Sequence, residues 1–257
     1  HTKEELFSYN SDAQMLPASV TKVLTAAVGF KNLGHAYRFP TDVYVVGEID
    51  SDHVLHGDVY IIGGGDPSIT TQDMWSIQQN IVDRGIFKVD GNIYFDDSLY
   101  QGPHMLPGWD KEVDIANGPS YFPYLSSLSL NRNCIAIKVR PGTQPGMPAD
   151  VYLDHELSFV EIENRVRTGS ASSRPRMSIT RTTTEEGLLQ YLMEGVIPIS
   201  ETRPWVYYRS IPNPSQYFAD TFKSVNESTK LDVRGSFLMK QYEEVFDYIY
   251  FYYLMPQ

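Results

Sequence analysis

The residues with the clearest chemical potential are a serine and a lysine three positions apart, in the run Pro17-Ala18-Ser19-Val20-Thr21-Lys22. On a helix, residues i and i+3 share one face, so Ser19 and Lys22 would be neighbours. A serine hydroxyl becomes a good nucleophile when a base removes its proton. A lysine can be that base when desolvation or a second cation lowers its pKa. The spacing therefore favours nucleophilic catalysis, with Ser19 attacking and Lys22 accepting the proton.

The same four residues also fit a simpler interpretation. Serine is favoured at helix N-termini, where its hydroxyl accepts hydrogen bonds from backbone N–H groups. Lysine is common on solvated helix faces. Ser19 would then be a helix cap and Lys22 a surface charge. The tetrapeptide does not decide between catalysis and capping, so the surrounding chain must.

A helix is needed to position the pair. Pro17 suits its first turn, because the N–H that proline lacks has no partner there. Apolar residues then recur at helical spacing, at Val20, Val23, Leu24, Ala27 and Val28. Gly34 is a plausible stop. We expect this helix to bury its apolar face beside a cleft, which would desolvate Lys22, and we expect a short strand at Leu6–Tyr9 before it.

The remaining chain reads as a mixture of strands and helices. β-Branched and aromatic runs predict strands at 43–46, 59–62, 93–95, 133–139 and 204–211. Helical patterns are expected at 71–84 and from Pro214 or Ser215. Residues 151–182 alternate in the manner of antiparallel strands, and an aromatic strand is expected at 248–253. The fold class predicted from these elements is α/β (α+β).

Composition excludes several functional classes. The net charge is −11 and no basic stripe is present, so we expect no nucleic-acid partner. No run approaches the roughly 18 apolar residues of a transmembrane segment. The six histidines lack paired spacing and Cys134 is the one cysteine, so we expect no metal site and no cofactor. The chain begins at His1 without a signal peptide, as a processed N-terminus would.

The wider context of Ser19 contains further recognisable stretches in a fixed order. They are Leu33-Gly34, Tyr37-Arg38-Phe39, Gly57–Tyr60, Gly63–Ser68, Gly91–Ile93, Phe95–Ser98, Pro107–Trp109, Leu130–Cys134 and Pro141-Gly142. Together with the serine–lysine run, the chain resembles the D-alanyl-D-alanine carboxypeptidase/endopeptidase family, the class C low-molecular-mass penicillin-binding proteins. The resemblance is collinear over about residues 6–235.

The resemblance implies a penicillin-binding-protein/β-lactamase-like serine transpeptidase fold, interrupted by a large inserted α/β and β-rich region. Residues 1–40 would begin the catalytic domain, 41–203 would form the inserted domains, and 204–257 would return to the catalytic domain. The implied activity is cleavage of D-Ala-D-Ala bonds in peptidoglycan stem peptides through an acyl-enzyme. β-Lactam antibiotics would acylate Ser19, and the location would be periplasmic or extracytoplasmic.

The resemblance also points to a substrate-binding loop. In the family, an acidic residue on an Asp-x-Ser-x-aromatic loop lies near the amino-bearing side chain of the substrate. Asp96 and Tyr100 match this loop by position. The alternative is that Asp96 only caps a turn, and the sequence leaves both interpretations open.

The sequence departs from the family pattern at two catalytic motifs, a Ser-x-Asn and a Lys-Thr-Gly. No Lys-Thr-Gly occurs in the chain. Ser129-Leu130-Asn131 and Arg167-Thr168-Gly169 imitate the two motifs, but both fall in the expected insertion, and we interpret them as structural. We therefore expect the natural chain to continue past Gln257 and the 257 residues alone to be nearly inactive.

Two other functions share these features. A non-catalytic peptidoglycan-binding homologue would keep the fold without the complete chemistry. A β-lactamase shares the serine–lysine spacing, although the large insertion after Lys22 argues against it. We expect the serine carboxypeptidase/endopeptidase over both.

Overall fold

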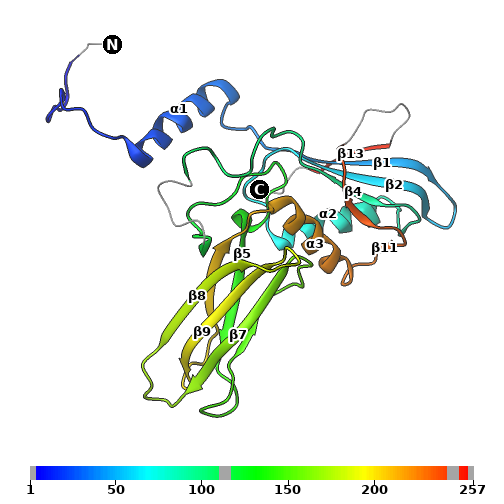
Figure 1. The fold of residues 1–257 in the computed structure, drawn as a ribbon. Coiled ribbons are helices and arrows are strands. Elements are labelled where there is room, and N and C mark those ends of the chain that lie inside the picture. Colours follow the sequence, from blue (N-terminus) through cyan, green and yellow to red (C-terminus); the bar gives the residue numbers. More distant parts are fainter. Residues whose placement is uncertain (1–3, 110–116, 242–248, 254–257) are drawn as a thin grey trace. The chain divides into compact units, whose positions relative to one another are not determined.

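The computed structural model describes residues 4–109, 117–241 and 249–253 (Figure 1). The chain divides into two compact units, His1–Arg38 and Phe39–Gln257. In the described ranges, no helix combines the length and the apolar character needed to cross a membrane.

Residues 4–38 of the first unit form a short 3-10 turn followed by a helix. Turn η1 spans Ala18–Val20 and helix α1 spans Thr21–Leu33. Gly34 ends α1 with a φ of 81°, and its N–H donates to the Phe30 carbonyl at 3.1 Å. Glycine is favoured at such left-handed helix ends because it has no Cβ. The helix after Pro17 and its end at Gly34 are thus confirmed.

One prediction for this unit is wrong, and another is not met by the residues of the unit itself. Leu6–Tyr9 form no strand, and Leu6 and Phe7 are 92% and 85% exposed. A strand needs a hydrogen-bonding partner, and residues 4–38 contain no second strand to provide one. Helix α1 has no buried residue, so its apolar face is not covered within its own unit.

The second unit is built around a mixed sheet. Its strands are β1 (Thr41–Ile49), β2 (Val54–Gly63), β3 (Lys88–Val89), β4 (Ile93–Asp96), β11 (Asp232–Val233), β12 (Phe237–Met239) and β13 (Ile249–Tyr253). Strands β1 and β2 form an antiparallel hairpin, and β2 also pairs in parallel with β3 and β4. The last three strands pair with β3, β4 and β1 respectively, so the chain returns to this sheet near its end.

Helices α2 (Thr71–Asp83) and α3 (Pro214–Asn226) pack against each other, and α3 also contacts β12 of this sheet. The Phe95 ring of β4 contacts both Phe218 and Phe222 of α3, with ring centroids 5.9 and 5.4 Å apart. Gln78 of α2 donates to the Phe222 carbonyl at 2.8 Å. All three phenylalanines are fully buried, so they belong to the central core of the unit.

Two smaller sheets complete the second unit. The first consists of β5 (Cys134–Arg140), β6 (Asp150–Tyr152) and β10 (Trp205–Ser210), all antiparallel. The second consists of β7 (Val160–Gly169), β8 (Arg176–Thr183) and β9 (Leu189–Pro198), which lie side by side in Figure 1. Strand β7 pairs in parallel with β9, and β8 pairs with β9 antiparallel. The prediction of antiparallel strands over 151–182 is therefore correct for β6 and β8 but wrong for β7.

The elements after residue 204 pack on elements from the preceding region. Strand β10 pairs with β5 over its whole length, and α3 contacts α2. Strands β11 and β12 extend the same sheet as β3 and β4. The assignment of residues 204–257 to a returning catalytic domain stays a prediction.

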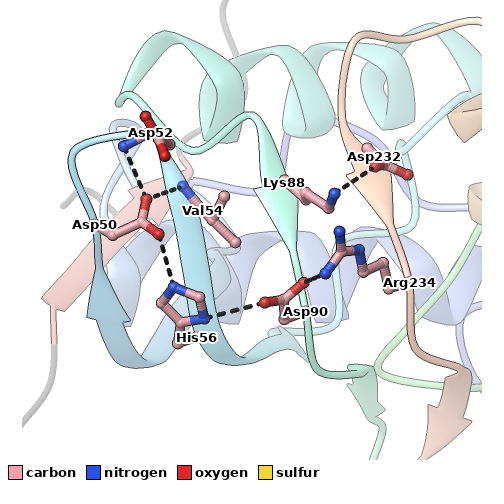
Figure 2. Close-up of polar contacts among 8 residues, drawn as sticks. All are labelled: Asp50, Asp52, Val54, His56, Lys88, Asp90, Asp232 and Arg234. Atoms are coloured by element: carbon pink, nitrogen blue, oxygen red, sulfur yellow. Dashed lines mark hydrogen bonds and ion pairs between the residues drawn. The ribbon is translucent and has the colours of Figure 1, made fainter.

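A charged network connects the hairpin turn to the sheet edge (Figure 2). Both ring nitrogens of His56 face carboxylates, with Nε2 2.7 Å from Asp50 Oδ2 and Nδ1 3.0 Å from Asp90 Oδ2. The guanidinium of Arg234 contacts the other oxygen of Asp90 at 2.6 Å. The hydrogen bond that the His56 ring donates to Asp50 raises the pKa of His56, and the hydrogen bond from the Val54 N–H lowers the pKa of Asp50. This network joins β2 to the residues that directly follow β3 and β11.

Candidate active site

The predicted contact between Ser19 and Lys22 is present. Lys22 Nζ donates to Ser19 Oγ at 3.0 Å. Ser19 lies in η1 and Lys22 in the first turn of α1, so the short helix start brings them together without help from distant residues. The capping alternative does not fit, because the N-cap positions of η1 and α1 are Pro17 and Val20. The geometry is that of a nucleophile beside a potential base.

The backbone next to Ser19 is strained. Ala18 has a φ of 42°, in the left-handed region. This region costs a residue with a Cβ about 1–2 kcal/mol. Strained residues of this kind are concentrated at functional sites. The strain at Ala18 sets the direction in which the chain enters the helix, and with it the position of the Ser19 hydroxyl.

The first unit brings Ser19 and Lys22 into contact but does not shield Lys22 from solvent. Ser19 and Lys22 are both exposed within residues 4–38. The neighbouring apolar side chains Val23 and Leu24 are also 67% and 68% exposed. Because a lysine becomes a base through burial or a nearby cation, the lowered pKa that the mechanism needs requires cover beyond that of residues 4–38.

In the second unit, Asp96 and Tyr100 lie at the carboxyl edge of two parallel strands. Ile62 of β2 pairs with Asp96 of β4, so the loops after both strands begin at the same edge. The first of these loops contains Gly65, with a φ of 83°, and a Cβ there would overlap the Tyr100 hydroxyl. Tyr100 is 49% exposed, whereas Asp96 is buried. The two residues that the family resemblance singled out, Asp96 and Tyr100, thus lie on one loop, and of the two only Tyr100 is exposed to solvent.

The Asp96 carboxylate has a turn-capping contact. Its Oδ1 accepts a hydrogen bond from the Ser98 N–H at 2.8 Å. This is the alternative that the sequence left open, and it fixes the start of the loop. A substrate contact for Asp96 stays a prediction.

Sequence reasoning missed the residues that anchor this loop. The Ser215 hydroxyl at the start of α3 donates to the Asp97 carboxylate, and Ser126 Oγ lies 2.9 Å from Ser215 Oγ. The adjacent residues Asp96 and Asp97 were the sequence feature that could have indicated this anchor. Adjacent side chains at the end of a strand point to opposite sides, so the two carboxylates need different partners. One caps the loop and the other connects it to α3.

The two segments that imitate the Ser-x-Asn and Lys-Thr-Gly motifs make hydrogen bonds within the fold. Ser129 is buried and donates to the Ser126 carbonyl at 2.9 Å. Asn131 donates to the side chains of Thr71 and Tyr217. Thr168 is buried and accepts from the Gly142 N–H at 2.7 Å. Among the described residues, no group of three or more His, Cys, Asp or Glu side chains is arranged to hold a metal ion.

Comparison with known proteins gives a family match over most of the chain. The D-Ala-D-Ala carboxypeptidase 3 (S13) family matches residues 1–245. The D-alanyl-D-alanine carboxypeptidase of Actinomadura sp. (strain R39) is 27% identical over 251 residues, which are 91% of this chain and 43% of that protein. The D-alanyl-D-alanine carboxypeptidase DacB of Haemophilus influenzae is 20% identical over 91% of this chain and 47% of that protein. The chain therefore spans less than half the length of these relatives.

A solved structure has the same fold. The crystal structure of penicillin binding protein 4 (dacB) from Haemophilus influenzae superposes with a TM-score of 0.73 at 19% identity, covering 96% of this chain and 53% of that one. A second structure of that protein, complexed with a novel β-lactam, gives a TM-score of 0.64 at 18% identity. The predicted fold class, a mixed α/β penicillin-binding-protein fold, is confirmed.

Proposed function

Because the chain belongs to the D-Ala-D-Ala carboxypeptidase 3 (S13) family, we propose that it forms the nucleophile-bearing part of a serine D-Ala-D-Ala carboxypeptidase/endopeptidase. The observation that carries this proposal is the 3.0 Å contact between Lys22 Nζ and Ser19 Oγ. Ser19 is the nucleophile and Lys22 is the base that activates it.

In the reaction, Ser19 Oγ attacks the carbonyl carbon of the penultimate D-Ala while its proton passes to Lys22. The bond to the terminal residue breaks, and the leaving nitrogen takes up a proton. Water then hydrolyses the Ser19 ester, releases the shortened peptide and restores the hydroxyl. This sequence needs neither a metal nor a redox cofactor, because acyl transfer only moves protons and one acyl group.

The oxyanion that forms during attack needs hydrogen-bond donors. The backbone N–H of Ser19 is one candidate, because the first N–H groups of a helix have no intrahelical acceptor. Such a donor is worth about 3–4 kcal/mol of transition-state stabilisation in related acyl transfers. The strained Ala18 directly precedes this N–H, so its conformation also sets the donor's direction.

On the substrate side, Asp96 and Tyr100 would contact the part of the stem peptide that carries a free amino group. A carboxylate attracts an ammonium group, and the half-exposed Tyr100 ring offers a contact surface on the same loop. β-Lactam antibiotics would react with Ser19 in place of the peptide. Since the substrate is the cell wall, the site of action would be periplasmic or extracytoplasmic.

The direct test is D-alanine release from a pentapeptide ending in D-Ala-D-Ala by the protein that contains this chain. We expect Ser19→Ala to lower kcat by about 10³-fold or more. The matched control is Ser8→Ala, which changes another exposed serine of the same unit and should leave release unchanged. Release at the wild-type rate by Ser19→Ala would exclude Ser19 as the nucleophile.

A further inference from the structure

The second unit contains a cavity whose lining includes none of the four candidate site residues. Its volume is ≈ 250 Å³, and its wall is formed by β5, the segment after β6, and single residues of α2, η4 (Asn131–Asn133), β10 and α3. Small-molecule pockets usually measure about 300–1,000 Å³, so this cavity has room for about one ring-sized group. Its residues come from distant parts of the sequence, so the folded unit builds it as a whole.

The polar part of the wall is held in place by hydrogen bonds. Asn131 Nδ2 donates to Thr71 Oγ1 at 3.0 Å and to the Tyr217 hydroxyl at 3.1 Å. The Tyr217 hydroxyl donates to the Cys134 carbonyl at 3.3 Å. These bonds use both amide hydrogens of Asn131, so its carbonyl oxygen, an acceptor, is the group that it can offer to a ligand.

The backbone that carries Asn131 is strained. Asn131, Arg132 and Asn133 have φ values of 48°, 59° and 54°, three consecutive left-handed residues. Consecutive left-handed residues without glycine are uncommon and persist when the surroundings enforce them. Here the Asn131 N–H donates to the Ile69 carbonyl at 2.8 Å, and Asn133 Oδ1 accepts from the Leu130 N–H. The fold therefore maintains an unfavourable turn that keeps Asn131 in the cavity wall.

The opposite side of the wall adds a carboxylate and an imidazole. Asp154 Oδ1 accepts from Lys138 Nζ at 2.5 Å, which balances its charge. His155 Nδ1 lies 3.2 Å from Ser224 Oγ. Burial lowers the pKa of His155, so its ring is uncharged near neutral pH. These two residues provide hydrogen-bonding groups with little net charge.

An exposed aromatic ring completes the cavity. Tyr208 of β10 lines it and is 56% exposed, whereas Leu157 and Ile135 in the same wall are buried. A tyrosine ring presents a flat apolar face with a polar tip. The CH groups on one face of a sugar ring pack well on such a surface.

The charges of the wall narrow the ligand class. Among the described residues that line the cavity, none is Arg or Lys, and Asp154 is the one carboxylate. Lys138 already pairs with Asp154, so a phosphate or carboxylate ligand would find no further cation in the wall to balance its own charge. A neutral ligand rich in hydroxyl and amide groups instead finds acceptors, an imidazole and an aromatic face.

We propose that this cavity binds one neutral, N-acetylated sugar ring of a glycan chain, stacked on Tyr208 and hydrogen-bonded by Asn131, Asp154 and His155. The acetyl methyl group would pack on the buried aliphatic wall around Leu157. This activity is additional to peptide cleavage and does not require Ser19. It would give the second unit a binding role of its own, directed at sugar instead of peptide.

The test measures binding of N,N′-diacetylchitobiose to the protein that contains this chain. Saturation-transfer NMR and a titration of backbone amide chemical shifts detect this binding. We expect saturable binding with a Kd of about 1 mM, which corresponds to the modest free energy available to one ring. Tyr208→Ala should weaken binding about tenfold, and Tyr208→Phe should retain it, because the phenyl ring preserves the stacking face.

Three comparisons make the outcome decisive. Tyr121→Ala removes another exposed tyrosine, outside the cavity wall, and should leave the Kd unchanged. Ser19→Ala should bind the disaccharide like the wild type, which separates this proposal from the peptidase proposal. Circular dichroism of Tyr208→Ala and Tyr208→Phe establishes that both variants are folded.

Absence of saturable binding, or equal binding by Tyr208→Ala and wild type, would overturn the proposal. So would preferential binding of an ammonium-bearing dipeptide that Asp154→Asn abolishes.

Discussion

Helices α1 and α3 each contain 13 residues, yet they are stabilised in different ways. Helix α1 has no buried residue, and it carries the Ser19–Lys22 contact at its start. Helix α3 buries eight residues, including Phe218 and Phe222 against Phe95 of the central sheet. Helix α1 therefore carries the proposed reactive pair without a buried face, whereas α3 has a buried face and none of the proposed catalytic residues.

The comparison separates two requirements of the proposed chemistry. The contact between Ser19 and Lys22 depends only on local helix geometry, so a short unit suffices to form it. The desolvation that would make Lys22 a base depends on tertiary packing of the kind that α3 has and α1 lacks within residues 4–38. The start of a helix can therefore bring the proposed catalytic pair into contact without the surroundings that would activate it.

The largest effect is expected from removing the proposed base, Lys22. In the protein that contains this chain, Lys22→Ala should slow acylation by a fluorescent penicillin by about 10²–10⁴-fold, the range of general-base contributions. Lys22→Arg should be similarly slow, because a guanidinium keeps its proton. The acylation rate is measured by quenching the labelling reaction at a series of times and quantifying the fluorescent protein band on a gel. Wild-type acylation by either variant would remove Lys22 from the mechanism and leave its contact with Ser19 as a surface hydrogen bond.

The next prediction contrasts the two helices in stability. In residues 1–257, Phe222→Ala should lower the free energy of unfolding by about 3–5 kcal/mol, since it empties a fully buried site. Leu24→Ala in α1 should change it by less than about 0.5 kcal/mol, because this side chain is 68% exposed. Denaturant titration measures both. Equal losses would show that α1 is packed as firmly as α3, and the contrast between the helices would fail.

A smaller effect tests whether the second unit serves the same reaction. Asp96→Asn should raise KM about tenfold for peptides with a free amino group on the diamino acid, because a hydrogen bond to a charged group is lost. Peptides with a neutral side chain at that position should keep their KM. Penicillin acylation should change little. If KM is unchanged for both peptide types, Asp96 only caps its turn through Ser98.

The smallest effect concerns the network around His56. Its pKa is raised, chiefly by the hydrogen bond that its ring donates to Asp50, so the protonated form is favoured in the folded state. The resulting stabilisation is fully present below the unfolded pKa of about 6.5 and is lost as the pH rises through the folded pKa.

His56→Gln should therefore lower the melting temperature slightly at pH 5.5 and not at pH 8.5. Because His56 is half exposed, added salt should weaken the difference. An NMR titration that places the His56 pKa at or below its ordinary value would contradict this account.

Much of the fold follows from sequence patterns, but strand partners and side-chain surroundings do not. Period-2 and period-3.6 patterns located the main strands and helices, because these patterns reflect local geometry. The parallel pairing of β7 with β9 could not be predicted, since alternation is the same in both kinds of sheet.

The candidate site shows the same limit. The Ser19–Lys22 contact was predictable because three residues separate its members, whereas the exposure of α1 depends on what packs against it. The cavity beside Tyr208 left no sequence signal at all. Its wall combines residues from Thr71 to Tyr217, and only the folded unit brings them together.

The most direct test of the central claim is to locate the β-lactam adduct. The protein that contains this chain is incubated with benzylpenicillin, digested and analysed by mass spectrometry. We predict that the peptide containing Ser19 carries the whole mass of the antibiotic and that Ser19→Ala carries none. An adduct on Ser129, or on any residue other than Ser19, would contradict the assignment of Ser19 as the nucleophile.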